Sequence, residues 1–199
     1  MLIGINSIFS NIGGRVVTFI REGLKLFYPF RDLETISHAS TGSTSFVTDD
    51  YVAIGDVDDL NFTTGNFSVA CWAKTSTTGT DGIVAKDYRW QLNIQGSNKF
   101  EFALYDGTNN PAIASSTSIN DDKWHHLVGV RGDGKIYLYV DGVLENTATD
   151  STGDISSTDT VDIGRRADAE FFNGSIANVG IWSRALSASE VQGIMYKQY

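Results

Sequence analysis

The sequence predicts an all-β domain built as a sandwich or a barrel. Short segments that alternate apolar and polar residues recur at a spacing of about 8–12 residues, which is typical of such folds. Turn-forming residues separate these segments, as in Gly132-Asp133-Gly134 and Asp141-Gly142. Asp outnumbers Glu 18 to 6, and Asp favours turns whereas Glu favours helices. The three observations together indicate many short strands joined by tight loops.

Ten segments carry the strand pattern, and the alternation is clearest over residues 135–140. There Ile136, Leu138 and Val140 share one face, while the two tyrosines between them lie on the other. The Gly-Asp-Gly turn before this segment predicts a hairpin with the preceding strand. The expected strands are 24–30, 51–54, 67–73, 83–85, 89–94, 100–105, 124–130, 135–140, 160–163 and 175–183.

One helix is expected after the strands, over residues 188–195. Ser187 is suited to cap its first turn, and Glu190 stands three residues later, which is the spacing of a capping box.

Composition and charge exclude several classes of protein. The chain has 199 residues with a single cysteine, which excludes an internal disulfide and a Cys-rich metal site. No apolar run approaches the roughly 20 residues that span a bilayer, so no membrane span is expected. The net charge is −9, which is the sum of +3 on residues 1–31 and −12 on the residues after position 31. Because an acidic body repels phosphate backbones, nucleic-acid binding is not expected.

Residues 1–22 are expected to form a separate N-terminal arm. They lack the basic start of a secretory signal, and residues 1–31 carry a charge of +3. Their apolar residues are spaced nearly as in a helix, which is compatible with packing on the chain's own domain or with docking on another protein subunit. We expect docking on another subunit, because burying each large apolar side chain is worth about 1.5–3 kcal/mol and the sandwich already has a complete set of inward residues between Leu24 and Trp182. These residues are Leu2, Ile3, Ile5, Ile8, Phe9, Ile12, Val16, Val17, Phe19 and Ile20.

Residues 23–199 resemble the laminin-G-like domains of the concanavalin A type. The matching stretches, in the family's order, are 23–30, 51–54, 67–74, 124–128, 137–142, 163–165 and 172–182, followed by 183–187 with Glu190. The resemblance implies an antiparallel jelly-roll sandwich with a short C-terminal helix, and it implies a binding function. Domains of this family often hold calcium at the sandwich rim, and by order along the chain the ligands would be Asp87, Asp159 and the carbonyl of Leu104.

Three tryptophans within the expected strands are predicted to fill the core, namely Trp72, Trp124 and Trp182. Trp90 follows a turn, so that packing against the sheet and stacking on a sugar both remain open. The candidate glycan-binding set combines flat aromatic rings with turn amides and a carboxylate. It consists of Tyr88, Trp90, Tyr105, Asp106, Asn109 and Asn110.

The sequence offers little for catalysis. A glycoside hydrolase on this fold needs two carboxylates about 5–10 Å apart, and Glu101 has no acidic residue two positions away on its strand. The adjacent His125 and His126 point to opposite faces of a strand, so one is expected buried and the other exposed, and they cannot share a metal ion. Cys71 lies in a strong strand and is expected to be a buried thiol. No catalytic residue is therefore predicted.

Three functional classes follow. The first is a non-enzymatic structural protein of a larger particle, such as a bacteriophage virion, with a lectin-like domain displayed on the virion surface. The second is a free or secreted extracellular module that binds carbohydrate, such as a cell-surface glycan, or mediates adhesion. The third is a glycoside hydrolase on the same fold. The basic, apolar arm favours the first, and the missing carboxylate pair counts against the third.

Overall fold

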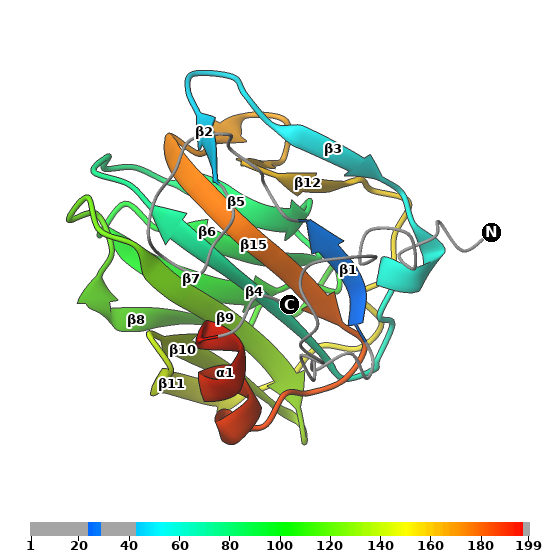
Figure 1. Cartoon of the computed structure of the whole chain (residues 1–199). Coiled ribbons are helices and arrows are strands. Elements are labelled where there is room, and N and C mark those ends of the chain that lie inside the picture. The colour runs from blue at the N-terminus through cyan, green and yellow to red at the C-terminus, as the bar shows by residue number, and fades with distance from the viewer. Residues whose placement is uncertain (1–23, 29–42, 197–199) are drawn as a thin grey trace, which may run out of the picture.

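The computed structural model describes residues 24–28 and 43–196, and in these residues two mostly antiparallel sheets face each other (Figure 1). The first sheet has the order β1-β15-β4-β9-β10-β11, with β2 also paired to β15. Its strands are β1 (Leu24–Tyr28), β2 (Thr44–Phe46), β4 (Phe67–Lys74), β9 (His125–Gly132), β10 (Lys135–Val140), β11 (Val143–Thr149) and β15 (Gly174–Trp182).

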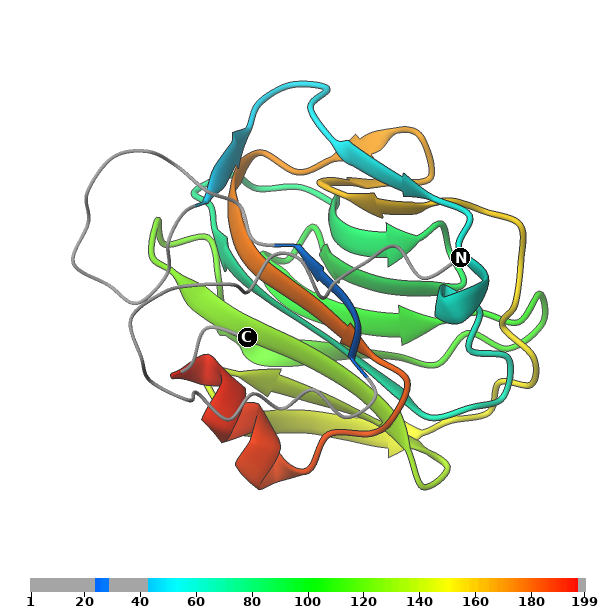
Figure 2. The same ribbon diagram turned by 45° about the vertical axis from the view of Figure 1, so that its right-hand side comes forward.

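The second sheet has the order β13-β14-β5-β6-β7-β8, and β12 joins β3 to β5 beside it. Its strands are β3 (Val52–Gly55), β5 (Asp81–Lys86), β6 (Trp90–Ile94), β7 (Lys99–Leu104), β8 (Ala112–Ser118), β12 (Val161–Ile163), β13 (Arg165–Arg166) and β14 (Glu170–Phe171). Figure 2 shows the two sheets as separate layers, with β15 in orange in the nearer one.

The main core lies between the sheets. Every second residue of the strands points into it, which places Ile136, Leu138 and Val140 of β10 on the inner face as predicted. The rings of Phe62 and Phe67 stack there with their centroids 4.5 Å apart. Both are at most 6% exposed, so the inner faces supply a complete apolar core.

The outer face of the first sheet is covered by α1 (Ala188–Met195). Val191 and Ile194 of the helix pack on a second apolar cluster that includes Tyr139 and Val128. The side chain of Ser187 accepts a hydrogen bond from the Glu190 amide, and the Glu190 carboxylate accepts one from the Ser187 amide. The predicted helix and its capping box are therefore confirmed, with the same bounds.

Two Asp-Gly turns set the hairpins β9–β10 and β10–β11. Asp133 and Gly134 have φ of 53° and 68°, and Asp141 and Gly142 have φ of 50° and 76°. Two consecutive positive φ angles make a two-residue turn whose twist matches that of the flanking strands.

The all-β sandwich is confirmed, and the observed strands differ from the expected ones in part. β2, β8, β11, β13 and β14 were not predicted. The expectation for Trp124 is wrong, because this residue precedes β9 and its side chain is 38% exposed, whereas Trp182 is fully buried. The expectation for Trp72 is also wrong: its strand parity is opposite to that of the core residues of β4, and it is half-buried with its ring centroid 5.3 Å from that of His126.

The expected arm, residues 1–22, lies outside the described residues. Within residues 24–28 and 43–196, no helix has the length and apolar character required to cross a membrane.

Candidate functional site

Strand β6 gives the second sheet a polar outer face. Trp90, Leu92 and Ile94 point into the core and are fully buried. The strand period of two therefore turns Gln91 and Asn93 outward. Gln91 is paired with Ala85 on one side and with Ala103 on the other. Because alanine side chains are short, the two neighbours leave space on the outer face around Gln91.

A pocket of about 290 Å³ opens at this place, lined by Tyr88, Gln91, Tyr105 and Asn110. Tyr88 belongs to the loop between β5 and β6, and Tyr105 and Asn110 belong to the loop between β7 and β8. The pocket thus has two phenol rings and two side-chain amides. Flat apolar rings together with planar polar groups suit a ligand that has both an apolar face and hydroxyl groups.

Arg166 of β13 supports two of these four residues from behind. Its guanidinium donates to Oε1 of Gln91 and lies 5.1 Å from the centroid of the Tyr88 ring. The carboxylate of Glu170 pairs with the same guanidinium. This network fixes the Gln91 amide and holds the Tyr88 ring by a cation–π contact.

The hairpin β13–β14 approaches the sheet closely at Gly82 of β5. A Cβ atom at Gly82 would meet the backbone of Arg165 and Arg166. Glycine is therefore required there for Arg166 to reach across to Gln91.

The loop that carries Asn110 is held by Asp106. Its Oδ1 accepts from the amides of Thr108 and Asn109 at 2.8 and 2.7 Å. Its Oδ2 accepts from the Asn109 side chain at 2.9 Å and from the Gly153 amide at 2.7 Å. These hydrogen bonds, the one from the Asn109 side chain above all, hold the pKa of Asp106 well below its usual range.

The six predicted glycan-binding residues therefore divide into three groups. Tyr88, Tyr105 and Asn110 line the pocket as a group. Asp106 and Asn109 bond to each other and shape the loop. Trp90 is a correction: it is fully buried and its ring lies 6.0 Å from Phe67, so it packs in the core and cannot stack on a sugar. Gln91 was missed by the sequence analysis, although the alternation of residues 90–94 marks it as outward.

Farther along the outer face, Glu101 of β7 accepts from the amides of two β6-side residues. The donor of Asn93 lies at 3.2 Å and that of Gln95 at 2.5 Å from its Oε1. A carboxylate bound to two amides is held in a fixed orientation, which suits a structural role better than that of a general acid.

Of the three predicted calcium ligands, Asp159 is engaged by the chain's own cations. The backbone carbonyl of Asp159 accepts from the ammonium of Lys86 at 2.7 Å, and its carboxylate pairs with Arg89 at 3.6 Å. Lys86 is fully buried and also bonds Asp56 at 2.9 Å. Leu104 points its side chain into the core and pairs with Trp90. This donor set does not fit a calcium ion as it stands, and calcium remains a prediction.

His125 and His126 are both buried, at 8% and 0% exposure, which corrects the expectation that one would be exposed. His125 is covered because its two ring nitrogens contact different carboxylates, Asp141 at 2.8 Å and Asp121 at 3.1 Å. Burial lowers the pKa of His126 to about 4. Cys71 is buried as predicted, and burial raises the pKa of its thiol.

Comparison with known protein families shows to which family the chain belongs. A family model described as the concanavalin A-like lectin/glucanases superfamily matches residues 46–192. The chain belongs to this family. The pocket thus lies on the outer face of the second sheet of a concanavalin A-like sandwich. A comparison with curated protein sequences found no match.

Three solved structures illustrate the similarity of fold. The binding domain of Paraclostridial Mosquitocidal Protein 1 is 14% identical, with a TM-score of 0.65 over 87% of this chain and 45% of that one. The ligand binding domain of botulinum neurotoxin serotype D, solved with N-acetylneuraminic acid, is 15% identical, with a TM-score of 0.65 over 86% and 45%. The binding domain of botulinum neurotoxin DC, solved with rat synaptotagmin II, is 18% identical, with a TM-score of 0.59 over 77% and 41%. This chain spans less than half the length of these domains.

Proposed function

We propose that this chain is a non-enzymatic, lectin-like binding domain that holds a glycan in the pocket of Tyr88, Gln91, Tyr105 and Asn110. The pocket is the observation that carries the proposal. A pyranose ring has an apolar face that stacks on a phenol and hydroxyl groups that bond amides, and the pocket offers both kinds of group. The solved relatives in complexes with N-acetylneuraminic acid and with a protein receptor support a binding role for the same fold.

The absence of a catalytic role is part of the proposal. Glu101 and Glu170, two carboxylates of the same outer face, are bonded to amides and to Arg166. A retaining or inverting glycosidase needs an acid whose proton is available to the leaving group. We therefore expect no cleavage of polysaccharides, and cleavage that is lost in Glu101→Gln would contradict this.

The experiment on the site uses two tyrosines of similar exposure. Tyr88 is 44% exposed in the pocket, and Tyr51 is 42% exposed outside it. Each lies under an arginine, Arg166 and Arg165 respectively. On a glycan array, Tyr88→Ala is expected to lose binding by about tenfold or more, whereas Tyr51→Ala keeps the binding of the unmodified protein. Equal losses in the two variants, or no binding by the unmodified protein, would contradict the proposal.

We further propose that residues 1–22 attach the domain to other protein subunits, with the acidic sandwich displayed at the surface of a virion. The support is the sequence: the arm is basic and rich in large apolar residues, and the body is acidic. Deleting residues 1–22 should leave a folded, soluble domain that no longer assembles. A truncated protein that unfolds or precipitates would assign the arm to the domain's own core. Assembly that persists after the deletion would contradict the attachment role of the arm.

A further inference from the structure

The cationic side chains around the pocket are already paired with carboxylates. Arg166 pairs with Glu170, Arg89 with Asp159, and Arg165 with Asp168. The ammonium of Lys86, which is fully buried, is bonded to Asp56 and to a backbone carbonyl. In the described strands and loops that flank the pocket, each of these four cations is thus neutralised by a neighbouring carboxylate.

The carboxylates near the pocket outnumber these four cations, because Arg165 pairs with both Asp162 and Asp168 and Asp87 has no ion-pair partner among the described residues. Asp87, next to Tyr88, has its pKa raised, first by burial and then by the charges of Asp159 and Asp168. Asp168 is 85% exposed at its side chain, so its charge is open to solvent. A negatively charged ligand arriving at Tyr88 would therefore meet repulsion.

The groups that face the pocket bind without charge. The Oε1 of Gln91 accepts a hydrogen bond from Arg166, which fixes the orientation of the amide and leaves its Nε2 as a donor. Asn110 brings a second amide, and the tyrosines bring aromatic faces. Amides and phenols match the hydroxyl groups of a neutral sugar. A carboxylate or sulfate group calls instead for arginine or lysine as a direct partner.

We infer that the pocket selects an uncharged glycan and rejects one that carries a carboxylate or sulfate group. This inference rests on the proposed glycan-binding function and specifies its ligand class. The deciding juxtaposition is that of Arg166 and Glu170. Arg166 contacts two residues of the pocket wall and is itself held by a carboxylate, so it orients Gln91 and Tyr88 but offers no free charge.

The experiment uses the full chain on an array that presents matched pairs of glycans. Lactose, N-acetyllactosamine, mannose and glucose oligosaccharides are each printed beside a sialylated, sulfated or uronic-acid form. We expect the neutral member of each bound pair to give at least about tenfold higher apparent affinity. Stronger binding of the acidic members would overturn the inference and leave the proposed function standing. No binding to any member would overturn both.

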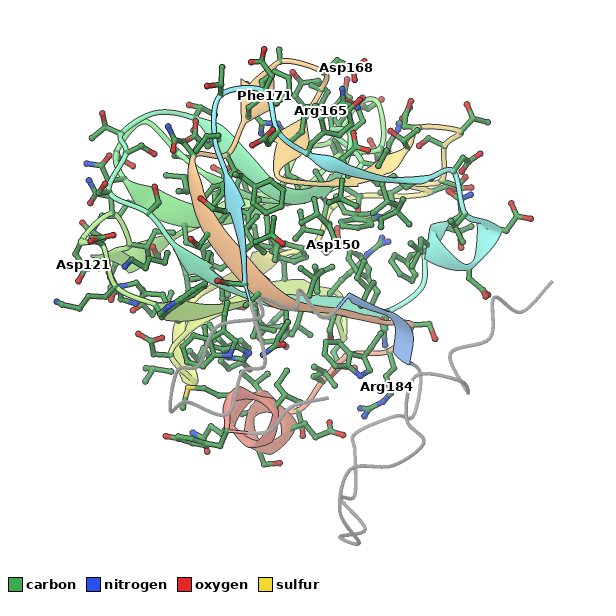
Figure 3. All side chains as sticks on the ribbon, turned by 45° about the horizontal axis from the view of Figure 1, so that its top comes forward. Asp121, Asp150, Arg165, Asp168, Phe171 and Arg184 are labelled. Carbon is green, nitrogen blue, oxygen red and sulfur yellow. The ribbon has the colours of Figure 1, made fainter. Side chains whose placement is uncertain are left out.

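A second variant tests the origin of the selectivity. Glu170→Gln frees the guanidinium of Arg166 and is expected to narrow the preference for neutral glycans to about threefold or less. The matched control is Glu190→Gln, which removes the same charge from a pair with Arg184 at 2.6 Å and keeps a residue suited to the capping box. Figure 3 shows Arg184 beside α1, at the opposite end of the molecule from Arg165. If the two variants shift the preference equally, net charge rather than the Arg166 pair sets the selectivity and the inference is overturned.

Discussion

Arg165 and Arg166 are consecutive residues of β13, and each lies over a tyrosine, yet they serve different ends. Arg165 stacks 3.6 Å from the centroid of the Tyr51 ring and bonds Asp162 and Asp168. Figure 3 shows Arg165, Asp168 and Phe171 together at one end of the molecule. Arg166 points to the other side of the strand, where it meets Tyr88 and Gln91. Strand alternation alone separates a closed ionic cluster from the wall of an open pocket.

An arginine that forms an ion pair with a carboxylate is not thereby part of a binding site. Both arginines are largely buried and both hold carboxylates. The two arginines differ in their second partner. Arg165 pairs with another carboxylate, that of Asp168, whereas Arg166 donates to the amide of Gln91, which lines the pocket. We therefore expect changes at Arg165 to alter stability alone, and changes at Arg166 to alter binding as well.

The largest effect is expected from Arg165→Ala. It removes the partner of Asp162, which is 6% exposed and whose Oδ1 has no hydrogen-bond partner among the described residues. Leaving a buried carboxylate unpaired should lower the free energy of unfolding by about 3–5 kcal/mol. Urea denaturation measures the loss, and glycan binding of the folded fraction should not change. A loss of binding would show that the two arginines act as one site.

Compared with Arg165→Ala, we expect Arg166→Ala to lower the free energy of unfolding less and to weaken glycan binding more. Its carboxylate partner Glu170 has a side chain that is 28% exposed and can be hydrated, so we expect a loss of about 1–3 kcal/mol. Gln91 and Tyr88 lose their support, and binding should fall by about tenfold or more. Denaturation and titration of the same preparation give both values. A variant that is destabilised but binds normally would contradict the role assigned to Arg166.

Gly82→Ala tests the close contact that brings the hairpin onto β5. The new methyl group collides with the backbone of Arg166, so we expect a loss of about 1–3 kcal/mol together with weaker binding. Gly96→Ala is the matched control, because its Cβ would meet nothing within 4 Å. That variant should stay within about 0.5 kcal/mol of the unmodified protein in thermal denaturation. Equal effects in the two variants would disprove the steric explanation.

The smallest effect is expected from Asp87→Asn. Because its folded pKa is raised above 3.8, the folded state binds the proton more tightly than the unfolded chain, and the charged form costs stability at pH 7. The amide should therefore raise the melting temperature slightly at pH 7, and the difference should vanish below pH 3.8. Asn also tolerates the φ of 46° at this position. A gain that persists at low pH would assign it to the backbone alone.

The same two proteins decide the calcium prediction. If Asp87 is a ligand, calcium chloride should raise the melting temperature of the unmodified protein and leave that of Asp87→Asn unchanged. Equal melting of both proteins with and without the ion would contradict a site at Asp87.

Much of the fold could be predicted because its signals are local. The Asp-Gly turns fix two hairpins, and Ser187 with Glu190 fixes the start of α1. β8 and β11 were missed because they carry small or polar residues and are half-exposed, so their alternation is weak. They are strands because they pair with β7 and β10, which no local pattern records.

The site could be predicted only in part, because it depends on contacts between distant segments. Tyr88, Tyr105 and Asn110 were found from their residue types, and the structure brings them to one pocket. Arg166 lies 75 residues from Gln91, and its contribution could not be read from the sequence. Trp90 was placed wrongly although the signal was present: it shares strand parity with Leu92 and Ile94, which are core residues.

The hydrogen bonds of Asp106 bear on the thermodynamics of binding. The loop that presents Asn110 is already closed by four donors before any ligand arrives. Ordering a free side chain at an interface costs about 0.5–1.5 kcal/mol, and a preorganised loop avoids most of that entropic cost. For the proposed glycan, association should thus resemble docking into a rigid receptor, with little loop rearrangement and with an affinity set by the few contacts that the pocket itself provides.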